Sequence, residues 1–395
     1  MAREDVRNTQ APGLPLKGIR VLDFSWLLPG PFCSMQLADL GAEVIKVESP
    51  GGDYARDMLP GLFSVANRNK AGLSLDLKSP DAAGLVERLV GQVDVVLEGF
   101  RPGVADRLGI GYERLSQINP GLVYASLSGY GSHGPDANRT GHDLNYLAMS
   151  GALSIPSQLD APPSRGGLPI ADLSAGLFAA LGIVSSLLER TASGKGRYLD
   201  VAMVASLMNL AQVRTADHLA SGGTDWPHVN PLNDMFRTKD GHWITLALVE
   251  PKFFREFCDL AGCADLAGSQ DYRDHLEKRD PTAAQRLAGA LRDIVAGRTR
   301  DEWSALLEEH ALPYAPVLSP AEAETSPQIE SLGLGRLDLP GGAPLPGSFG
   351  FPIPGLGTRE GVPAPEKGEH SDQVLASFGF APDQIESLRS RGVLG

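Results

Sequence analysis

Asp172 has the sequence surroundings that most favour chemistry. It lies in LPIADLSAG, where apolar residues flank it on both sides and a helix of small residues is predicted to begin. A carboxylate at the start of such a helix could act as a nucleophile or as a base. Free N–H groups of the first turn could stabilise an oxyanion. A structural role stays open, because aspartate is also a preferred N-cap of helices.

The segment GHDLNY brings His142 and Asp143 to the start of another predicted helix, which continues as YLAMSGALS. Asp143 could equally cap this helix or take part in function. His142 adjoins a glycine-rich loop, which favours a functional role for it. Glu250 closes the apolar run ITLALV before Pro251. Taken alone, Glu250 predicts only a solvated charge at the end of a strand.

The glycine-rich loop GYGSHG (129–134) fits the pattern G-x-G-x-x-G and follows a predicted strand. A dinucleotide site would also require a helix to open there and an acidic residue about 20 positions further on. Pro135 and the polar residues DANRT follow instead, so no helix is predicted. We interpret the loop as a flexible connection at the carboxyl end of a strand, which is where α/β proteins place their ligands.

Basic residues are frequent in and after the first predicted strands. Any one of them could be an ordinary surface charge, but together they could receive a ligand that carries phosphate groups. They are Lys46, Arg56, Arg68, Lys70, Arg101 and Arg107.

Composition narrows the class of protein. The chain of 395 residues has a formal net charge of −13, which argues against nucleic-acid binding and against attachment to anionic lipid. Its three cysteines form no CxxC pair, so neither a disulfide framework nor a zinc site is predicted, and a reducing compartment fits. No apolar signal segment or membrane-spanning run is visible, so we expect a cytoplasmic protein without a membrane partner.

Short apolar strands alternate with helices in the first half of the chain, which predicts βαβ units and a mostly parallel sheet. The predicted strands are 18–25, 43–49, 73–79, 94–100 and 122–131, and helices between them include 31–42 and 80–93. A long helix is expected over 171–190, and a strand continuing into a helix over 198–214. The fold class is therefore α/β.

The pattern changes in the second half of the chain. A β-hairpin is predicted over 235–249 with Asp240 and Gly241 at its turn. Two short helices are expected around Pro382. Further helices are predicted near 251–262, 282–298 and 300–310, and the Pro- and Gly-rich segment 336–368 is predicted to lack regular structure. The chain then divides into a first α/β part (1–224), a smaller α+β domain (225–325) and a C-terminal segment (326–395).

The sequence resembles the class III coenzyme A transferase (CaiB/BaiF) family, which also contains the α-methylacyl-CoA racemases. The resemblance covers nearly the whole chain. It rests on GIRVLDFSWLLPGPFCSMQLADLGAEVIKVESP at the front, then on EGFRPGVADRLGIGYERL, GHDLNYLAMSGAL, LPIADLSAG and RTASGKGRYLDVAM, and on the tail GEHSDQVLASFGFAPDQIESLRSRGVLG.

The resemblance implies a Rossmann-like large domain built from both ends of the chain, a small domain, and a homodimer of interlocked subunits. The substrate would be an acyl-CoA, with no cofactor beyond its CoA part. The active site would lie between the large domain and the small domain of the partner subunit. Positions expected to contact CoA are Lys46, Arg68, Leu75, Arg101, Arg107 and Asp143.

Two activities occur in this family. In the transferases, the aspartate matching Asp172 attacks the acyl thioester to form a mixed anhydride, and the released CoA thiolate then attacks that anhydride to leave an enzyme-bound thioester. In the racemases the same aspartate is a base on one face of the α-carbon. There the histidine matching His142 is the base on the other face, and a glutamate matching Glu250, in VEPKFF, supports the site.

His142, Asp172 and Glu250 together favour a racemase that inverts the α-carbon of 2-methylacyl-CoA thioesters through an enolate. The stretch DLSAG that begins at Asp172 lacks the glycine-rich run DFxGG of racemases and is nearer to some transferases. A CoA transferase therefore remains the alternative. A non-catalytic CoA-binding protein would have no need of both acid-base candidates.

Overall fold

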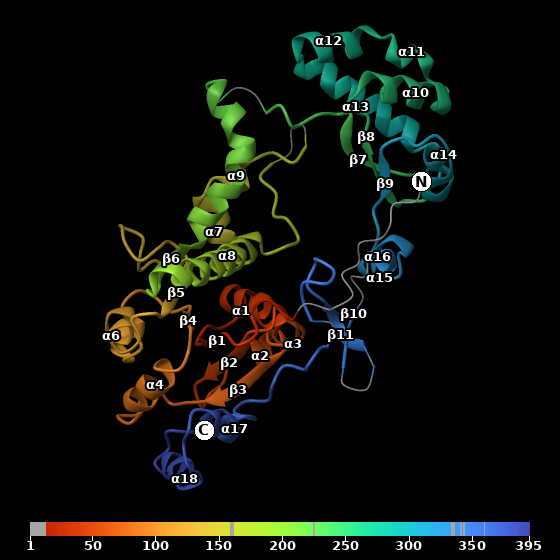
Figure 1. Ribbon diagram of the computed structural model, residues 1–395. Helices are drawn as coiled ribbons and strands as arrows, with labels where there is room; N and C mark the ends of the chain where they lie inside the picture. The colour runs from red at the N-terminus through yellow and green to blue at the C-terminus, as the bar shows by residue number, and fades with distance from the viewer. Residues whose placement is uncertain are drawn as a thin grey trace. The chain divides into compact units, whose positions relative to one another are not determined.

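The computed structural model describes residues 13–158, 162–223, 226–332, 336–339, 342, 344–358 and 360–395. The chain forms two compact units (Figure 1). The first unit runs to Ala152 and also contains Gly166–Leu210 and Pro327–Gly395. The second unit consists of Leu153–Arg165 and Ala211–Ser326. The second unit thus takes residues 153–165 and 211–224, which the sequence pattern assigned to the first α/β part.

A six-stranded parallel sheet forms the core of the first unit, and the predicted α/β class is confirmed. The strand order is β3-β2-β1-β4-β5-β6, so the winding direction reverses between β1 and β4. Leu22 of β1 lies between Ile45 of β2 and Val96 of β4. The strands read as apolar runs because both faces of the sheet are covered. They are β1 (Arg20–Asp23), β2 (Glu43–Glu48), β3 (Lys70–Ser74), β4 (Val95–Glu98), β5 (Val123–Ser128) and β6 (Arg197–Ala202).

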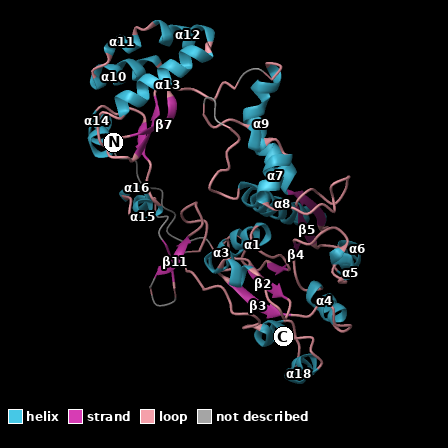
Figure 2. Ribbon diagram, turned by 180° about the vertical axis from the view of Figure 1, so that it is seen from behind, coloured by secondary structure: helices cyan, strands magenta, loops and turns pink. Residues whose placement is uncertain are grey.

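Helices cover each face of this sheet. On one face, α1 (Pro29–Asp39) and α8 (Ile170–Ser193) bury the side chains of β1, β4 and β5. The other face is covered by α4 (Ala82–Val90), α6 (Tyr112–Ile118), α17 (Ser371–Ser377) and α18 (Pro382–Ser390). Figure 1 shows α17 beside β3, and in Figure 2 the C-terminus lies next to the same strand, so the C-terminal segment packs against a strand from the first part of the chain.

The long helix α8 packs closely against α1. A Cβ at Gly176 would lie only 2.7 Å from the carbonyl oxygen of Pro29, so glycine is needed at this crossing. Among the described residues, α8 is the one helix long and apolar enough to cross a membrane, and half of its apolar window is buried. Because its buried face lies on α1 and the sheet, we interpret α8 as a core helix of the first unit.

The second unit is built on a small antiparallel sheet of order β7-β8-β9. The predicted hairpin is confirmed by the pairing of β7 (Asn233–Arg237) with β8 (Trp243–Ala247). Gly241 in its turn has a φ of 81°, a conformation that favours glycine. The sheet is completed by β9 (Tyr314–Pro316), and α10 (Pro251–Ala261), α13 (Pro281–Val295) and α14 (Arg300–Glu309) enclose its apolar core.

The expectation that 336–368 lacks regular structure is wrong in part. The strands β10 (Arg336–Asp338) and β11 (Pro344–Phe349) pair antiparallel. A two-stranded sheet consists only of edges, where proline is tolerated, so the proline content did not exclude strands there. The remaining elements are α2 (Ala55–Met58), α3 (Pro60–Ala66), α5 (Val104–Arg107), α7 (Asp143–Met149), a 3-10 turn (Ala152–Ser154), α9 (Met203–Ala220), α11 (Ala264–Ala267), α12 (Gln270–Lys278), α15 (Pro320–Glu324) and α16 (Pro327–Ser331).

Candidate active site

The candidate active site is a cavity of about 740 Å³ in the first unit, at the carboxyl ends of β1, β4 and β5. This is the point where the strand order reverses, which is the usual ligand position in open α/β sheets. His142 and Asp172 both line the cavity. Loops after the strands supply further lining residues, among them Trp26, Tyr54, Phe100, Arg101 and Tyr146.

Asp172 lies in the first turn of α8, whose N-cap is Pro169. The structural alternative in which Asp172 is itself the cap is therefore wrong. Burial, and in second place the charge of Asp143, raises the pKa of the Asp172 carboxyl from 3.8 to about 7. A group with this pKa is present in both protonation states at neutral pH, which suits proton transfer. The ionised form can equally attack a thioester.

Asp143 is neither a cap of its own helix nor a group exposed to a ligand. The N-cap of α7 is His142, and the Asp143 side chain is buried. Its Oδ1 accepts a hydrogen bond of 2.7 Å from the N–H of Ala171, in the first turn of α8. The side chain therefore ties α7 to the start of the helix that carries Asp172, and the predicted CoA contact of Asp143 stays a prediction.

His142 is exposed at the cavity, and its surroundings fix its backbone. The N–H of His142 donates to the side-chain oxygen of Asn145 at 3.0 Å. The hydroxyl of Tyr146 donates to the carbonyl of Gly141 at 2.6 Å. A Cβ at Gly129 would lie 2.3 Å from the Tyr146 ring, so only glycine allows the end of β5 to approach α7 this closely.

The first turn of α8 has fewer free N–H groups than the sequence suggested. The N–H of Ile170 donates to the carbonyl of Leu168, and that of Ala171 donates to Asp143. The N–H of Leu173 donates to the carbonyl of Pro169. In this turn, within the described part of the chain, the N–H of Asp172 remains to meet an oxyanion in the cavity.

Two of the predicted phosphate-binding residues lie where a ligand could meet them. Arg101 and Arg107 are exposed, and both line a second cavity of about 620 Å³. That cavity shares Trp26, Tyr54 and Arg101 with the first one, so the two are adjacent. A long ligand with an anionic end could therefore extend from Asp172 to these two arginines.

The side chains of the other three predicted CoA contacts are buried, and the contacts at these positions stay predictions. Lys46 is fully buried and is paired with Asp53 at 2.8 Å. Arg68 is almost fully buried and is paired with Asp39 at 2.5 Å. Leu75 is buried in the apolar core beside the sheet. None of these three side chains has the exposed surface that a direct phosphate contact needs.

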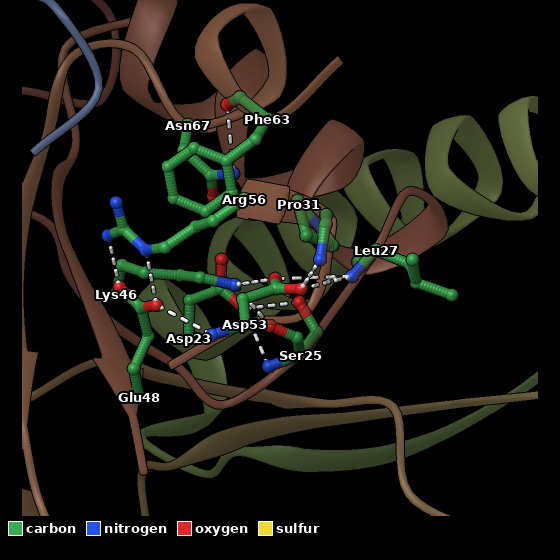
Figure 3. Close-up of polar contacts among 12 residues, drawn as sticks. Asp23, Ser25, Leu27, Pro31, Lys46, Glu48, Asp53, Arg56, Phe63 and Asn67 are labelled. Carbon is green, nitrogen blue, oxygen red and sulfur yellow. Dashed lines mark hydrogen bonds and ion pairs between the residues drawn. The ribbon is translucent and has the colours of Figure 1, made fainter. Parts of the chain in front are cut away.

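A buried network of charges beneath the cavity was not anticipated from the sequence. Figure 3 shows Asp53 between Lys46 and the N–H of Leu27, in the loop from β1 to α1. Trp26 and Leu27 of this loop line the cavity. Asp53, which follows Gly51 and Gly52, was the sequence signal that could have revealed this network. An aspartate between glycines and a helix is typical of a turn in which the carboxylate binds backbone N–H groups.

Glu250 belongs to the second unit, where it is the N-cap of α10 and is exposed. Its supporting role stays a prediction. The glycine-rich loop after β5 leads to no helix until α7 begins at Asp143. The loop therefore lacks the helix N-terminus on which a dinucleotide site depends.

A doubly wound sheet with a cavity at its switch point, lined by a carboxyl whose pKa is raised by burial, is typical of enzymes of the Rossmann-like α/β class. Comparison with known proteins then gives the family. The family described as CoA-transferase family III matches residues 16–371. The chain belongs to this family.

Both activities occur among its relatives. The chain is 32% identical over 400 residues to a succinate–glutarate CoA-transferase of Agrobacterium fabrum, which covers 92% of this chain and 96% of the relative. It is 32% identical over 399 residues to an α-methylacyl-CoA racemase of Homo sapiens, in an alignment that covers 96% of this chain and 98% of the relative. A crystal structure of a CaiB/BaiF family protein from Brucella suis aligns at a TM-score of 0.81 with 29% identity, covering 93% of this chain and all of that one. Overall identity therefore does not separate the two activities.

Proposed function

We propose that this enzyme epimerises the α-carbon of 2-methylacyl-CoA thioesters by a two-base mechanism. The observation that carries the proposal is that His142 and Asp172 line one cavity. Inversion of a carbon requires that a proton leaves one face while another arrives at the opposite face. Two side chains that can each accept and donate a proton, here an imidazole and a carboxyl in the same cavity, can do this.

In one direction, the ionised Asp172 removes the α-proton and the C–H electron pair moves into the thioester as an enolate. The protonated His142 then delivers its proton to the other face of the same carbon, and the enolate returns to a thioester. The reverse direction exchanges the two roles. The Asp172 pKa of about 7 keeps both forms of this carboxyl populated between turnovers. The N–H of Asp172 is a candidate donor to the enolate oxygen.

The substrate's CoA part is assigned to the second cavity. Arg101 and Arg107 supply positive charge there, and Trp26, Tyr54 and Phe100 supply aromatic surface. Guanidinium groups bind phosphate oxygens well, and aromatic rings accommodate the flat adenine. The proposal uses no cofactor besides the CoA that the substrate carries. The three free cysteines agree with a reducing compartment, and we propose the cytoplasm.

The test is incubation of a single (2S)- or (2R)-methylacyl-CoA epimer with the enzyme in D₂O. We expect deuterium to enter the α-position and the other epimer to form. Asp172→Ala should abolish both events, and His142→Asn should lower epimerisation by about 10²- to 10⁴-fold, the usual contribution of a proton-transferring side chain. Absence of α-deuterium for every epimer and chain length tested would remove the racemase proposal.

His133→Asn is the matched control for the histidine variant. His133 lies in the neighbouring glycine-rich loop, is strongly exposed, and lines a different cavity from Asp172. Its substitution should leave epimerisation unchanged. An equal loss in both variants would mean that the effect of His142→Asn does not come from proton transfer.

A CoA transferase is the second candidate, and the stretch DLSAG that begins at Asp172 favours it. In that case Asp172 attacks the thioester carbonyl, the thiolate of CoA leaves, and a mixed anhydride forms on the carboxylate. Hydroxylamine should then trap an activated Asp172, and CoA should move to an acceptor acid. His142→Asn should affect this reaction far less than epimerisation, so the same variant separates the two functions.

We also propose that the enzyme works as a homodimer, with the interlocked arrangement that its family resemblance implies. An exposed apolar stripe on α8, formed by Leu177, Leu181 and Leu188, supports the proposal. These residues are spaced as one face of a helix and would be covered by a second copy. Leu181→Glu should shift the sedimenting species toward the monomer, and an unchanged mass would count against this interface.

A further inference from the structure

Leu27 has a backbone conformation that its side chain disfavours. Its φ is 62°, in the left-handed region that glycine adopts readily and leucine rarely does. Leu27 lies in the loop between β1 and α1 and lines the cavity together with Trp26. A strained residue persists only where its surroundings hold it, and such residues cluster at functional sites.

The Asp53 carboxylate is the group that holds Leu27. The N–H of Leu27 donates to both of its oxygens, at 3.2 Å and 3.3 Å. The same carboxylate accepts from the N–H of Ala55 at 2.9 Å. Asp53 is 2% exposed, so water cannot replace these bonds. Its neighbour Tyr54 lines the cavity, and one carboxylate therefore joins two parts of the cavity wall.

Lys46 completes the arrangement from below. Its ammonium group donates to Asp53 at 2.8 Å and to the carbonyl of Ser25 at 2.6 Å. Figure 3 shows the Lys46 side chain reaching toward Asp53 and the loop that contains Ser25 and Leu27. The loop is therefore attached on both sides of Trp26, at Ser25 through Lys46 and at Leu27 through Asp53.

Trp26 links the conformation of this loop to the shape of the two ligand cavities. Its ring lies edge-on to Tyr54 at 5.7 Å and to Phe100 at 6.5 Å between centroids. These three rings line both the cavity of Asp172 and the cavity of Arg107. A loop that left its strained conformation would move Trp26 out of this group of rings.

We propose that Lys46 and Asp53 are positioning residues that form a buried latch, holding Leu27 in the left-handed conformation so that Trp26 and Leu27 form the wall of the CoA-binding cavity. The proposal rests on the proposed function for the identity of the ligand. Neither residue touches the ligand or the reacting atoms. Without the latch, a leucine at this position leaves the left-handed region, and only the fraction of molecules that retain it binds well.

The test is a set of variants that separates the latch from the strain. Lys46→Met/Asp53→Asn removes both buried charges together, which avoids leaving one of them unpaired. Titration calorimetry with coenzyme A should show binding weakened by about 5- to 30-fold, the range that corresponds to the cost of a left-handed leucine. In steady-state assays KM should rise by a similar factor while kcat changes little, because Asp172 and His142 are untouched.

Leu27→Gly is the background in which loss of the latch should have the least effect on CoA binding. Glycine adopts the left-handed region without help, so Lys46→Met/Asp53→Asn should weaken CoA binding by less than about threefold when residue 27 is glycine. Leu27→Asn repeats the comparison with a larger side chain that also tolerates this conformation. Equal weakening in the leucine and glycine backgrounds would overturn the latch.

A stability cycle tests the latch without any ligand. When the latch is intact, Leu27→Gly relieves the strain and should lower the unfolding equilibrium constant or raise it only slightly. When the latch has been removed, no strain is enforced, so the same substitution should raise that constant more. The expected coupling is about 5- to 30-fold in that constant. If coenzyme A fails to bind even the unmodified protein, the proposed function falls, and this cycle still decides whether Lys46 and Asp53 hold Leu27.

The pair Arg68 and Asp39 provides the matched control. It is a buried ion pair of the same unit, at 2.5 Å, and its other side-chain hydrogen bonds among the described residues go to partners outside the loop of Leu27. Arg68→Met/Asp39→Asn should lower stability by the same amount in the leucine and glycine backgrounds. Coupling of this control pair to Leu27 as strong as that of Lys46 and Asp53 would refute the specific role of the latch.

Discussion

Asp143→Asn is a perturbation whose effect on pH dependence can be worked out from the site. The variant removes the charge of Asp143 and keeps a side-chain oxygen that can accept from the N–H of Ala171. The pKa of Asp172 is raised from 3.8 to about 7, chiefly by burial and secondarily by the Asp143 charge. Without that charge the Asp172 carboxylate forms more easily, so the pKa of Asp172 falls.

The size of the effect is bounded by the order of the two causes. Since burial is the larger one, Asp143 accounts for less than half of the elevation, and we expect the acid limb of kcat/KM to move down by about one pH unit. About one pH unit below the wild-type midpoint, the ionised fraction of Asp172 should then rise from about a tenth to about a half, and relative activity about fivefold. Well above the midpoint, the two proteins should have equal activity.

The assay is the kcat/KM of α-proton exchange, measured from about pH 5 to about pH 9. Burial raises the pKa of Tyr146 to about 12 and also raises that of Tyr54, so these neighbours stay neutral over this range. Asp143→Ala is the comparison: it should move the limb in the same direction and also lower Tm, because the bond to Ala171 is lost. An acid limb that stays in place in Asp143→Asn would refute the reasoning.

Two further outcomes are expected from the geometry of the site. Asp172→Asn should be inactive yet more stable, by about 2 kcal/mol above pH 7 after allowance for solvent at the cavity, or roughly 2 to 4 °C in Tm. The folded-state pKa of Asp172 lies above its unfolded value, so the gain in stability should grow as pH rises from 4 to 7 and vanish at lower pH. A gain in thermal stability that does not depend on pH would contradict this expectation. Gly129→Ala should lower kcat/KM more than about tenfold, because the new Cβ lies 2.3 Å from the Tyr146 ring and displaces α7. Gly84→Ala, in α4 with open space at its Cβ, is the control that should retain activity.

The sheet could be predicted from the sequence because its strands are short apolar runs between helices. The third strand is the exception, since it occupies Lys70–Ser74 and the predicted strand was 73–79. Lys70 looked like a loop residue because of its charge. In the fold it is buried and donates to Asp23 at 3.2 Å. A lysine can enter a strand when a buried carboxylate faces it, and that partner lies on another strand.

The same reason limits what the sequence could say about the site. The cavity that contains His142 and Asp172 agrees with the sequence motifs, because each motif occupies the end of a predicted element. Lys46 and Arg68 looked equally suited to a phosphate. Lys46 instead pairs with Asp53, and Arg68 pairs with Asp39. No sequence motif links the members of either pair, so the sequence alone does not reveal the pairing. Local sequence gives the chemistry of a side chain, but only the tertiary fold determines which partner uses it.

The apolar core on the face of the sheet covered by α4, α6, α17 and α18 contains residues that are synthesised at very different times. Leu22 and Val96 share an apolar core with Val374, Leu375 and Phe378 of the C-terminal helices. At ordinary translation speeds, the interval between β4 and α17 lasts roughly 15 to 55 seconds. During that interval α17 cannot yet cover the part of the sheet that it contacts in the folded protein. The yield of folded protein in a cell therefore depends on what protects this apolar surface on the ribosome until the last helices emerge.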